Sequence, residues 1–373
     1  MIADDGFAGA GGWDIAAARL GIEARGIENM KEARATRDAA GLITIHDDVW
    51  TFEPDGKAVG KIDSPPCQTF SAAGKGSGRK ALEDVLRGIR DRYYVDRDHL
   101  RFLGLEVGDE RTSLVLTPLH FATQYDYEWL AWEQVPTVLP VWEACAEVLR
   151  DKGWHAWTGL LHAEQYGVPQ TRKRAFLLAS RRHPITPPVP THSRYYSRTP
   201  ENLDHGVAKW VSMAEGLGWG LLNRPAYTVV GGSGGRNTNG TEWGSSAVRD
   251  ALYAAQGDPR QWTLRASNHA HSAVRHATHP APTLVFGHCS NDVRWYPAGS
   301  THSGVAETAA GRHPDSIRVS VPEAGVLQSF PVDYPWRGTR TRQYLQVGNA
   351  IPPGLALHAL ATAAGIDALG VAA

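Results

Sequence analysis

Short apolar runs alternate with amphipathic stretches along the first 180 residues of the chain. A run that is apolar at every second position predicts a strand, whereas apolar residues three and four apart predict a helix. Strands are predicted at residues 2–6, 24–27, 42–45, 59–63, 129–132, 159–163 and 174–179. Helices are predicted between them at residues 13–20, 31–40 and 141–152. This alternation is typical of an α/β sheet.

The pattern changes near residue 183. From there to about residue 315, Pro, Gly, Trp and His are frequent and the apolar periodicity fades, which predicts a small, mostly β, loop-rich module. Two similar stretches, 224–231 and 279–285, each predict a turn that leads into a strand. Beyond the module we expect helices at 321–329 and 354–364, with a turn at 346–353 between them. The predicted domains are therefore 1–182 plus 316–373, and an inserted 183–315.

The net charge of −1 conceals an uneven distribution of charged residues. Residues 1–169 contain 18 Lys and Arg against 27 Asp and Glu, whereas residues 170–320 contain 17 against 9. A basic second half favours contact with the phosphates of a nucleic acid. Ordinary surface variation is the alternative explanation.

Cysteine content and the lack of long apolar runs limit the class of protein. Cys67, Cys145 and Cys289 are too few and too far apart for a disulfide framework or a zinc cluster, so we expect no metal. Neither a signal peptide nor a run of about 18 apolar residues occurs. We therefore expect a cytoplasmic, soluble monomer without a membrane contact.

A glycine-rich turn follows the first predicted strand. The order of strand, turn (FAGAGG, residues 7–12) and helix is typical of a site for a nucleotide-like ligand. The glycine spacing differs from the G-x-G-x-x-G of dinucleotide enzymes, so a pyrophosphate site is the weaker interpretation. Glu28 and Asp48 follow the second and third strands, where carboxylates could accept hydrogen bonds from a ribose and an adenine. Because these groups all lie at the carboxyl ends of successive strands, we expect them to line one shared crevice for a ligand.

The fourth predicted strand leads into Ser64-Pro65-Pro66-Cys67-Gln68-Thr69-Phe70-Ser71. The two prolines end the strand and hold the cysteine on a rigid turn. A glycine-rich basic segment, residues 72–79, follows. This arrangement suits a thiolate nucleophile that acts on a large anionic substrate, and a buried, inert cysteine is the alternative. The charge-dense residues 79–111 predict a helix and loop over the crevice, or a solvated helix.

Seven strings occur in a fixed order: FAGAGG, EN, DDV, PPCQTFS, EQV, QTRKR and QVGNAIPP. With these strings the sequence resembles the cytosine-C5 DNA methyltransferases of bacteria and their phages, outside roughly residues 183–315. The resemblance implies a Rossmann-like, doubly wound α/β sheet that binds S-adenosylmethionine, and an inserted target-recognition domain. It also implies that the substrate is duplex DNA whose target cytosine is flipped out of the helix.

The resemblance assigns roles to individual residues. Cys67 would attack C6 of the cytosine, Glu133 would bind or protonate N3, and Arg172 would hold O2. Cofactor contacts are implied for Phe7, Gly9, Gly11, Gly12, Glu28, Asp48 and Asn349. Substrate or DNA contacts are expected from Gln68, Ser71, Lys75, Arg79, Arg174, Arg224 and Arg236, although Gln170 and Arg174 match the flanks of the arginine string and favour a structural role.

The chain departs from the family pattern at three places. Gly6 replaces a leucine before Phe7, which we expect to loosen the first strand and weaken cofactor binding. Gln134 replaces an asparagine after Glu133 and is one methylene longer. Asp63 and Ser64 replace glycines before Pro65.

Three other functions are compatible with parts of the sequence. The same chemistry could act on RNA, but the recognition segment of about 130 residues favours DNA, because reading base edges needs a dedicated module. A catalytically dead DNA-binding relative would lack Cys67, Glu133 or Arg172, and all three are present. A dinucleotide-dependent oxidoreductase is disfavoured by the glycine spacing. The target sequence, and the choice between a restriction–modification enzyme and a solitary phage enzyme, stay open.

Overall fold

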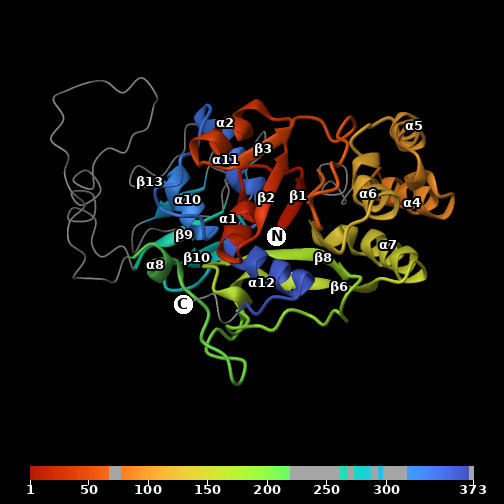
Figure 1. The fold of residues 1–373 in the computed structure, drawn as a ribbon. Coiled ribbons are helices and arrows are strands. Elements are labelled where there is room, and N and C mark those ends of the chain that lie inside the picture. The colour runs from red at the N-terminus through yellow and green to blue at the C-terminus, as the bar shows by residue number, and fades with distance from the viewer. Residues whose placement is uncertain are drawn as a thin grey trace.

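A seven-stranded sheet in the order β3-β2-β1-β4-β5-β8-β6 forms the centre of the computed structural model (Figure 1). The structure describes residues 1–66, 77–218, 261–266, 273–284, 286, 293–296 and 317–368. Strands β3 to β5 in this order run parallel, and β8 lies antiparallel between β5 and β6. The strands are β1 Ile2–Gly6, β2 Glu23–Ile27, β3 Ile43–His46, β4 Gly60–Asp63, β5 Trp129–Gln134, β6 His155–His162 and β8 Lys173–Ser180. The predicted doubly wound α/β sheet is confirmed.

Helices cover both faces of this sheet (Figure 1). One face carries α1 Gly12–Arg19, α2 Lys31–Ala39 and α12 Pro353–Ala364. The other face carries α4 Ser77–Arg90, α5 Arg97–Val107, α6 Thr117–Gln124 and α7 Leu139–Asp151. Successive side chains of a strand point to opposite faces, so Ala131 of β5 packs with α1 and α12, whereas Trp132 packs with α6 and α7. All six residues of β5 are buried, as expected for a strand covered on both sides.

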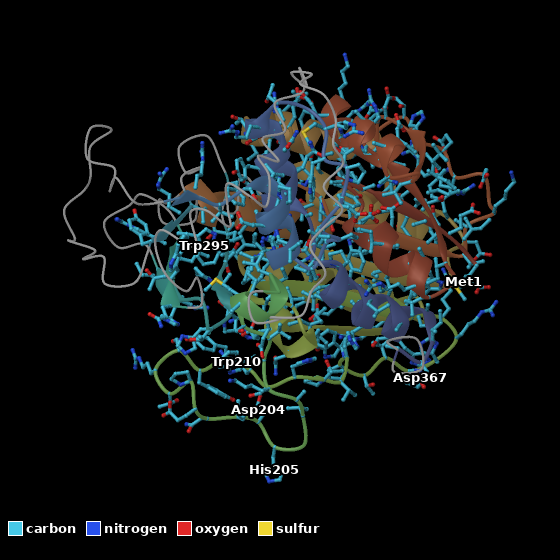
Figure 2. All side chains as sticks on the ribbon, turned by 90° about the vertical axis from the view of Figure 1, so that its left-hand side faces the viewer. Met1, Asp204, His205, Trp210, Trp295 and Asp367 are labelled. Carbon is cyan, nitrogen blue, oxygen red and sulfur yellow. The ribbon has the colours of Figure 1, made fainter. Side chains whose placement is uncertain are left out.

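Two small sheets combine strands of the predicted insert, residues 183–315, with strands just outside it at 170–171 and 317–318. One is antiparallel, with the order β10-β9-β12-β13, and consists of β9 Thr263–Arg265, β10 Val274–His276, β12 Arg294–Tyr296 and β13 Ile317–Arg318. The other pairs β7 Gln170–Thr171 with β11 Ala281–Pro282. Trp295 is buried with Trp262 in the core of this region. Figure 2 shows Trp295 near the small sheet, and Asp204 and His205 on a loop that projects from the body. Of the two similar stretches, 224–231 lies outside the described residues, and 279–285 contains β11.

Short helices connect these layers. Two of them, α8 Met213–Gly216 and α10 Val321–Leu327, begin with capping boxes, in which a serine and the glutamate three residues later satisfy each other's backbone N–H groups. The remaining helices are η1 Tyr93–Val95, η2 Ser113–Leu116, η3 Pro136–Val138, η4 Ala163–Tyr166 and α11 Arg340–Asn349. In the described part of the chain, no helix combines the length and the apolar character needed to cross a membrane.

The prediction of a turn over residues 346–353 is wrong for its first half. Residues 346–349 form the last turn of α11, and the non-helical connection to α12 is limited to residues 350–352. A Gly-Asn pair often indicates a turn, but Gly348 serves a different purpose here. A Cβ at this position would lie 3.2 Å from the backbone nitrogen of Phe286, so the glycine allows α11 to approach the inserted region closely.

Candidate functional site

A cleft lies at the carboxyl ends of β1, β2 and β3. Its lining includes Phe7, Glu28, Asp48, Val49 and Trp50. These residues follow three neighbouring parallel strands, which end at the same edge of the sheet. Ligands of open α/β sheets bind at this edge. The predicted shared crevice for Phe7, Glu28 and Asp48 therefore has a structural counterpart.

The Glu28 carboxylate is held in place by two backbone amides. The N–H of Gly9 donates to Oε2 and the N–H of Met30 donates to Oε1, both at 2.7 Å. Positive φ angles of 60° at Phe7 and 56° at Gly9 shape the turn that makes the first of these bonds. Each carboxylate oxygen can accept more than one hydrogen bond, so Glu28 can still bind hydroxyl groups of a ligand in the cleft.

The other glycines of the turn serve close packing. A Cβ at Gly12 would lie 2.3 Å from the carbonyl oxygen of Ile351, and a Cβ at Gly11 would lie 2.2 Å from Cδ1 of Leu42. Gly11 also has a φ of 100°, a left-handed conformation that starts α1. Gly11 thus allows the turn to pack against Leu42, just before β3, and Gly12 allows it to pack against Ile351, just before α12. Asn349, also predicted to contact a cofactor, is the last residue of α11.

Glu133 near the end of β5 forms the centre of a second polar cluster. It is 5% exposed, and its Oε1 pairs with Nε of Arg174 at 2.9 Å. The hydroxyl of Ser64 donates to its Oε2 at 3.3 Å, and Nε1 of Trp13 donates to the same hydroxyl at 2.9 Å. Both oxygens of the carboxylate are thereby engaged. The cluster lies at the same edge of the sheet as the cleft, because β4 and β5 run parallel to β1.

The two arginines of the QTRKR string have different partners. Arg172 is 2% exposed and its Nη2 donates to the carbonyl of Gly348 at 2.9 Å. It lies in the bend between β7 and β8, where strand alternation is interrupted. Arg174 lies in β8 itself, which runs antiparallel to β5 and pairs Gln134 with Ala175. Within the described residues, it is Arg174 that forms the ion pair with Glu133. No sequence pattern indicates that Arg174 lies beside this carboxylate. Gln170, interpreted as structural, is buried and its side-chain amide lies 3.5 Å from the carbonyl of Leu327.

The turn toward the candidate nucleophile is anchored at its start. Nε2 of Gln134 donates to the carbonyl of Pro65 at 2.5 Å, and Gln134 is buried. Cys67, Gln68, Ser71 and Lys75 lie outside the described residues, as do Arg224 and Arg236. Arg79 falls in the first turn of α4. The bond from Gln134 explains how the longer amide at this position is accommodated.

Gly6 does not loosen β1, contrary to expectation. It pairs in register with Ile27 of β2 and Asp63 of β4. A Cβ at Gly6 would lie 2.0 Å from Oδ1 of Asp63, which itself receives a 2.6 Å ion pair from Lys61. Burial raises the pKa of Asp63 to about 6. Two of the departures from the family pattern, at residues 6 and 63, are therefore spatial partners.

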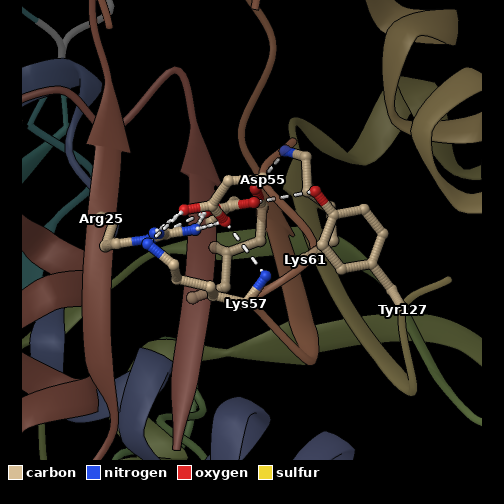
Figure 3. Close-up of polar contacts among 7 residues, drawn as sticks. Arg25, Asp55, Lys57, Lys61 and Tyr127 are labelled. Atoms are coloured by element: carbon tan, nitrogen blue, oxygen red, sulfur yellow. Dashed lines mark hydrogen bonds and ion pairs between the residues drawn. The ribbon is translucent and has the colours of Figure 1, made fainter. Parts of the chain in front are cut away.

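Another polar network stabilises the acidic first strand, buried at Asp4 and Arg25 and open to solvent at Asp55 (Figure 3). The guanidinium of Arg25 pairs with Asp4 at 2.7 Å and with Asp55 at 2.9 Å, and the Tyr127 hydroxyl donates to Asp4 at 2.9 Å. Burial, followed by the charge of Asp14, raises the pKa of the neighbouring Asp5 well above its usual value. No local sequence pattern indicates this network, since its members are separated by up to 123 residues.

The described residues also include the cysteine Cys145, and their acidic, cysteine and histidine side chains bear on metal binding. Cys145 is buried in α7, and desolvation raises the pKa of its thiol, so it is unsuited to act as a nucleophile. For the ranges that the structure describes, no group of three or more His, Cys, Asp or Glu side chains is arranged to hold a metal ion.

Comparison with known proteins extends these observations. A family model described as C-5 cytosine-specific DNA methylase matches residues 107–363. The chain is 24% identical over 366 residues to the type II methyltransferase M.HgiDI of Herpetosiphon aurantiacus, which covers 94% of this chain and 90% of the relative. It is 23% identical over 354 residues to the type II methyltransferase M.DdeI of Desulfomicrobium norvegicum, covering 84% of this chain and 76% of the relative.

The fold also matches a solved structure. The crystal structure of the S. pombe Dnmt2 methyltransferase superposes with a TM-score of 0.54 and 14% identity over 97% of both chains. This match supports the predicted fold, and the family match spans well over half of the chain. The resemblance seen in the ordered sequence strings is confirmed. The chain belongs to the C-5 cytosine-specific DNA methylase family.

Proposed function

We propose that this protein transfers a methyl group from S-adenosylmethionine to C5 of a flipped-out cytosine in duplex DNA. Its biological role would be restriction–modification or the protection of phage DNA. The observation that carries the proposal is the position of Glu133. This buried carboxylate, paired with Arg174, lies at the same sheet edge as the cleft of Phe7, Glu28 and Asp48. A base and a nucleotide-like methyl donor can therefore meet there.

The chemistry of the cleft suits S-adenosylmethionine. Carboxylates accept hydrogen bonds from hydroxyl and amino groups, and Glu28 and Asp48 supply them on a lining that also includes the rings of Phe7 and Trp50. Glu28 would hold the ribose and Asp48 the adenine amino group, while the aromatic rings would contact the purine. When bound, the cofactor supplies an electrophilic methyl group.

Cytosine C5 is a weak nucleophile, so the proposed reaction begins with a covalent bond. The Cys67 thiolate adds to C6, and the electron pair displaced from the C5–C6 bond makes C5 nucleophilic. Glu133 holds N3 and favours its protonation as charge develops on the ring. After C5 is methylated, the C5 proton leaves to a base and the Sγ–C6 bond breaks, which regenerates the thiolate.

Arg174 is the better candidate for the arginine that acts beside Glu133. Its Nε contacts Oε1 of Glu133, and a guanidinium has further N–H donors that could reach O2 of the same cytosine. Arg172, which the resemblance assigned to O2, holds the carbonyl of Gly348. We therefore propose that Arg174 contacts the base and that Arg172 joins the catalytic sheet to α11.

Duplex DNA is the proposed substrate because of the charge distribution. Residues 170–320 carry 17 Lys and Arg against 9 Asp and Glu, and they contain the two small sheets. A basic region beside the site can neutralise phosphates while the base is bound. Residues in this region would also select the target sequence.

The test is transfer of labelled methyl groups from S-adenosylmethionine to mixed-sequence duplex DNA, followed by base-resolution mapping. Wild type and Cys145→Ala should label cytosine C5, and Cys67→Ala should not. Cys145→Ala is the matched control, since it removes a thiol that is buried in α7. Labelling by Cys67→Ala would contradict the covalent mechanism. Label found only on RNA would replace the DNA substrate, and no label on any nucleic acid would overturn the proposed function.

A further inference from the structure

Ser64 connects a rigid tryptophan to the carboxylate of Glu133. The Trp13 indole nitrogen lies 2.9 Å from Ser64 Oγ, and this oxygen lies 3.3 Å from Glu133 Oε2. An indole N–H can only donate, a carboxylate oxygen can only accept, and a serine hydroxyl has a single proton. The direction of both hydrogen bonds is thereby fixed: Trp13 donates to Ser64, and Ser64 donates to Glu133.

Trp13, the first donor in this series of hydrogen bonds, has little freedom to move. Trp13 is 1% exposed and lies in the first turn of α1. Its ring meets that of Phe176 edge to face at a centroid distance of 6.3 Å. Gly12, the preceding residue, lies against the carbonyl of Ile351. A donor held this firmly orients the Ser64 hydroxyl toward Glu133.

Glu133 is consequently held from two sides. Arg174 engages Oε1 at 2.9 Å and Ser64 engages Oε2, which together fix the plane of the carboxylate. If Ser64 lost its hydroxyl, the carboxylate could rotate about its last bond while one oxygen stayed with Arg174. Oriented hydrogen-bonding groups contribute to catalysis mainly by avoiding such reorganisation during the reaction.

We propose that Ser64, aligned by Trp13, is a positioning residue that orients Glu133 toward the cytosine ring. This inference rests on the proposed function, because it assigns Glu133 to the base. Ser64 precedes Pro65, whose carbonyl accepts a hydrogen bond from Gln134. The same short segment thus orients Glu133 and carries the backbone toward Cys67.

The experiment compares methyl transfer to duplex DNA by Ser64→Ala, Ser64→Thr and Trp13→Phe. Ser64→Ala should lower kcat by about 10- to 100-fold, the effect of one hydrogen bond to a charged group. The KM for DNA should change by no more than about twofold, because the proposed role of Ser64 is to orient Glu133 and not to bind the substrate itself. Ser64→Thr keeps the hydroxyl and should retain most of kcat. Trp13→Phe keeps a ring but removes the N–H, so its kcat should fall between those of wild type and Ser64→Ala.

Ser113→Ala is the matched control. It removes a buried hydroxyl that donates to the carbonyl of Glu110 in a remote part of the chain, and it should leave kcat unchanged. Melting temperatures of all variants exclude unfolding as the cause of lost activity. A normal kcat in Ser64→Ala, or a Ser64→Thr as slow as Ser64→Ala, would overturn the positioning role while wild-type activity upholds the proposed function. An inactive wild type would overturn both.

Discussion

Gly6→Ala tests whether Gly6 and Asp63 share one space in the sheet. The added Cβ would lie 2.0 Å from Oδ1 of Asp63 and 2.8 Å from Nζ of Lys61. Neither Asp63 nor Lys61 is exposed, so the carboxylate cannot turn toward solvent to avoid the methyl group. The substitution must therefore separate the buried ion pair or shift the strand.

The size of the effect follows from that geometry. Disrupting a buried ion pair costs about 3–5 kcal/mol, so Gly6→Ala should lower the free energy of unfolding by about 3 kcal/mol. In an Asp63→Ala background, the nearest remaining atom is Nζ at the flexible end of Lys61, 2.8 Å away. There the same methyl group should cost about 1 kcal/mol.

Urea unfolding of wild type, both single variants and the double variant measures this difference. The measurement is made at pH 8, above the pKa of about 6 of Asp63, so that the carboxyl group is ionised. The cost of Gly6→Ala should be about 2 kcal/mol smaller in the Asp63→Ala background. Independent sites add within about 0.5 kcal/mol. Equal costs within that margin in the two backgrounds would refute the shared-space argument.

Two further predictions concern the same sheet edge. Because burial raises the pKa of Asp63 from 3.8 to about 6, its stabilising contribution is complete below about pH 4 and is lost as the pH rises through 6. Wild type should therefore lose about 2–2.5 kcal/mol more than Asp63→Asn between pH 4 and pH 7 in urea titrations, and parallel curves would contradict this. Arg174→Lys should slow methyl transfer about 100-fold, because an ammonium cannot reproduce the guanidinium contacts, whereas Arg172→Lys should mainly lower the melting temperature. The opposite ranking in rate assays and thermal unfolding would restore Arg172 as the residue that contacts the base.

Much of the central sheet could be predicted from the sequence because its inner strands, such as β4 and β5, are buried on both faces. The pattern over residues 2–6 and 129–132 matches β1 and much of β5, and the apolar helix predicted at 354–364 is α12. Such segments have few alternatives, since their side chains must avoid water on every side. The positions of Glu28 and Asp48 after their strands followed from the same logic.

The pairing of residues across the sheet could not be predicted. Alternation assigns a side chain to a face of a strand, but it does not identify the neighbour on the next strand. The antiparallel register of β8 on β5, which brings Arg174 to Glu133, is therefore invisible in the sequence. Gly6 was misjudged for the same reason, because the group that fills its space belongs to another strand, 57 residues away.

Contacts at the glycine turn, at the start of α1 and at α2 join residues from opposite ends of the sequence. Gly12 lies against Ile351, the Tyr334 hydroxyl donates to the carbonyl of Ala10, and the Thr36 hydroxyl lies 2.7 Å from Oε1 of Gln346. A ribosome synthesises the amino-terminal partner of each pair more than 300 residues before the other, and contacts of such separation form late in folding. The glycine turn beside the cleft thus gains its support only when translation reaches α12. Chains released before that point would carry an unsupported turn and an uncovered sheet face, which are features that favour aggregation and proteolysis.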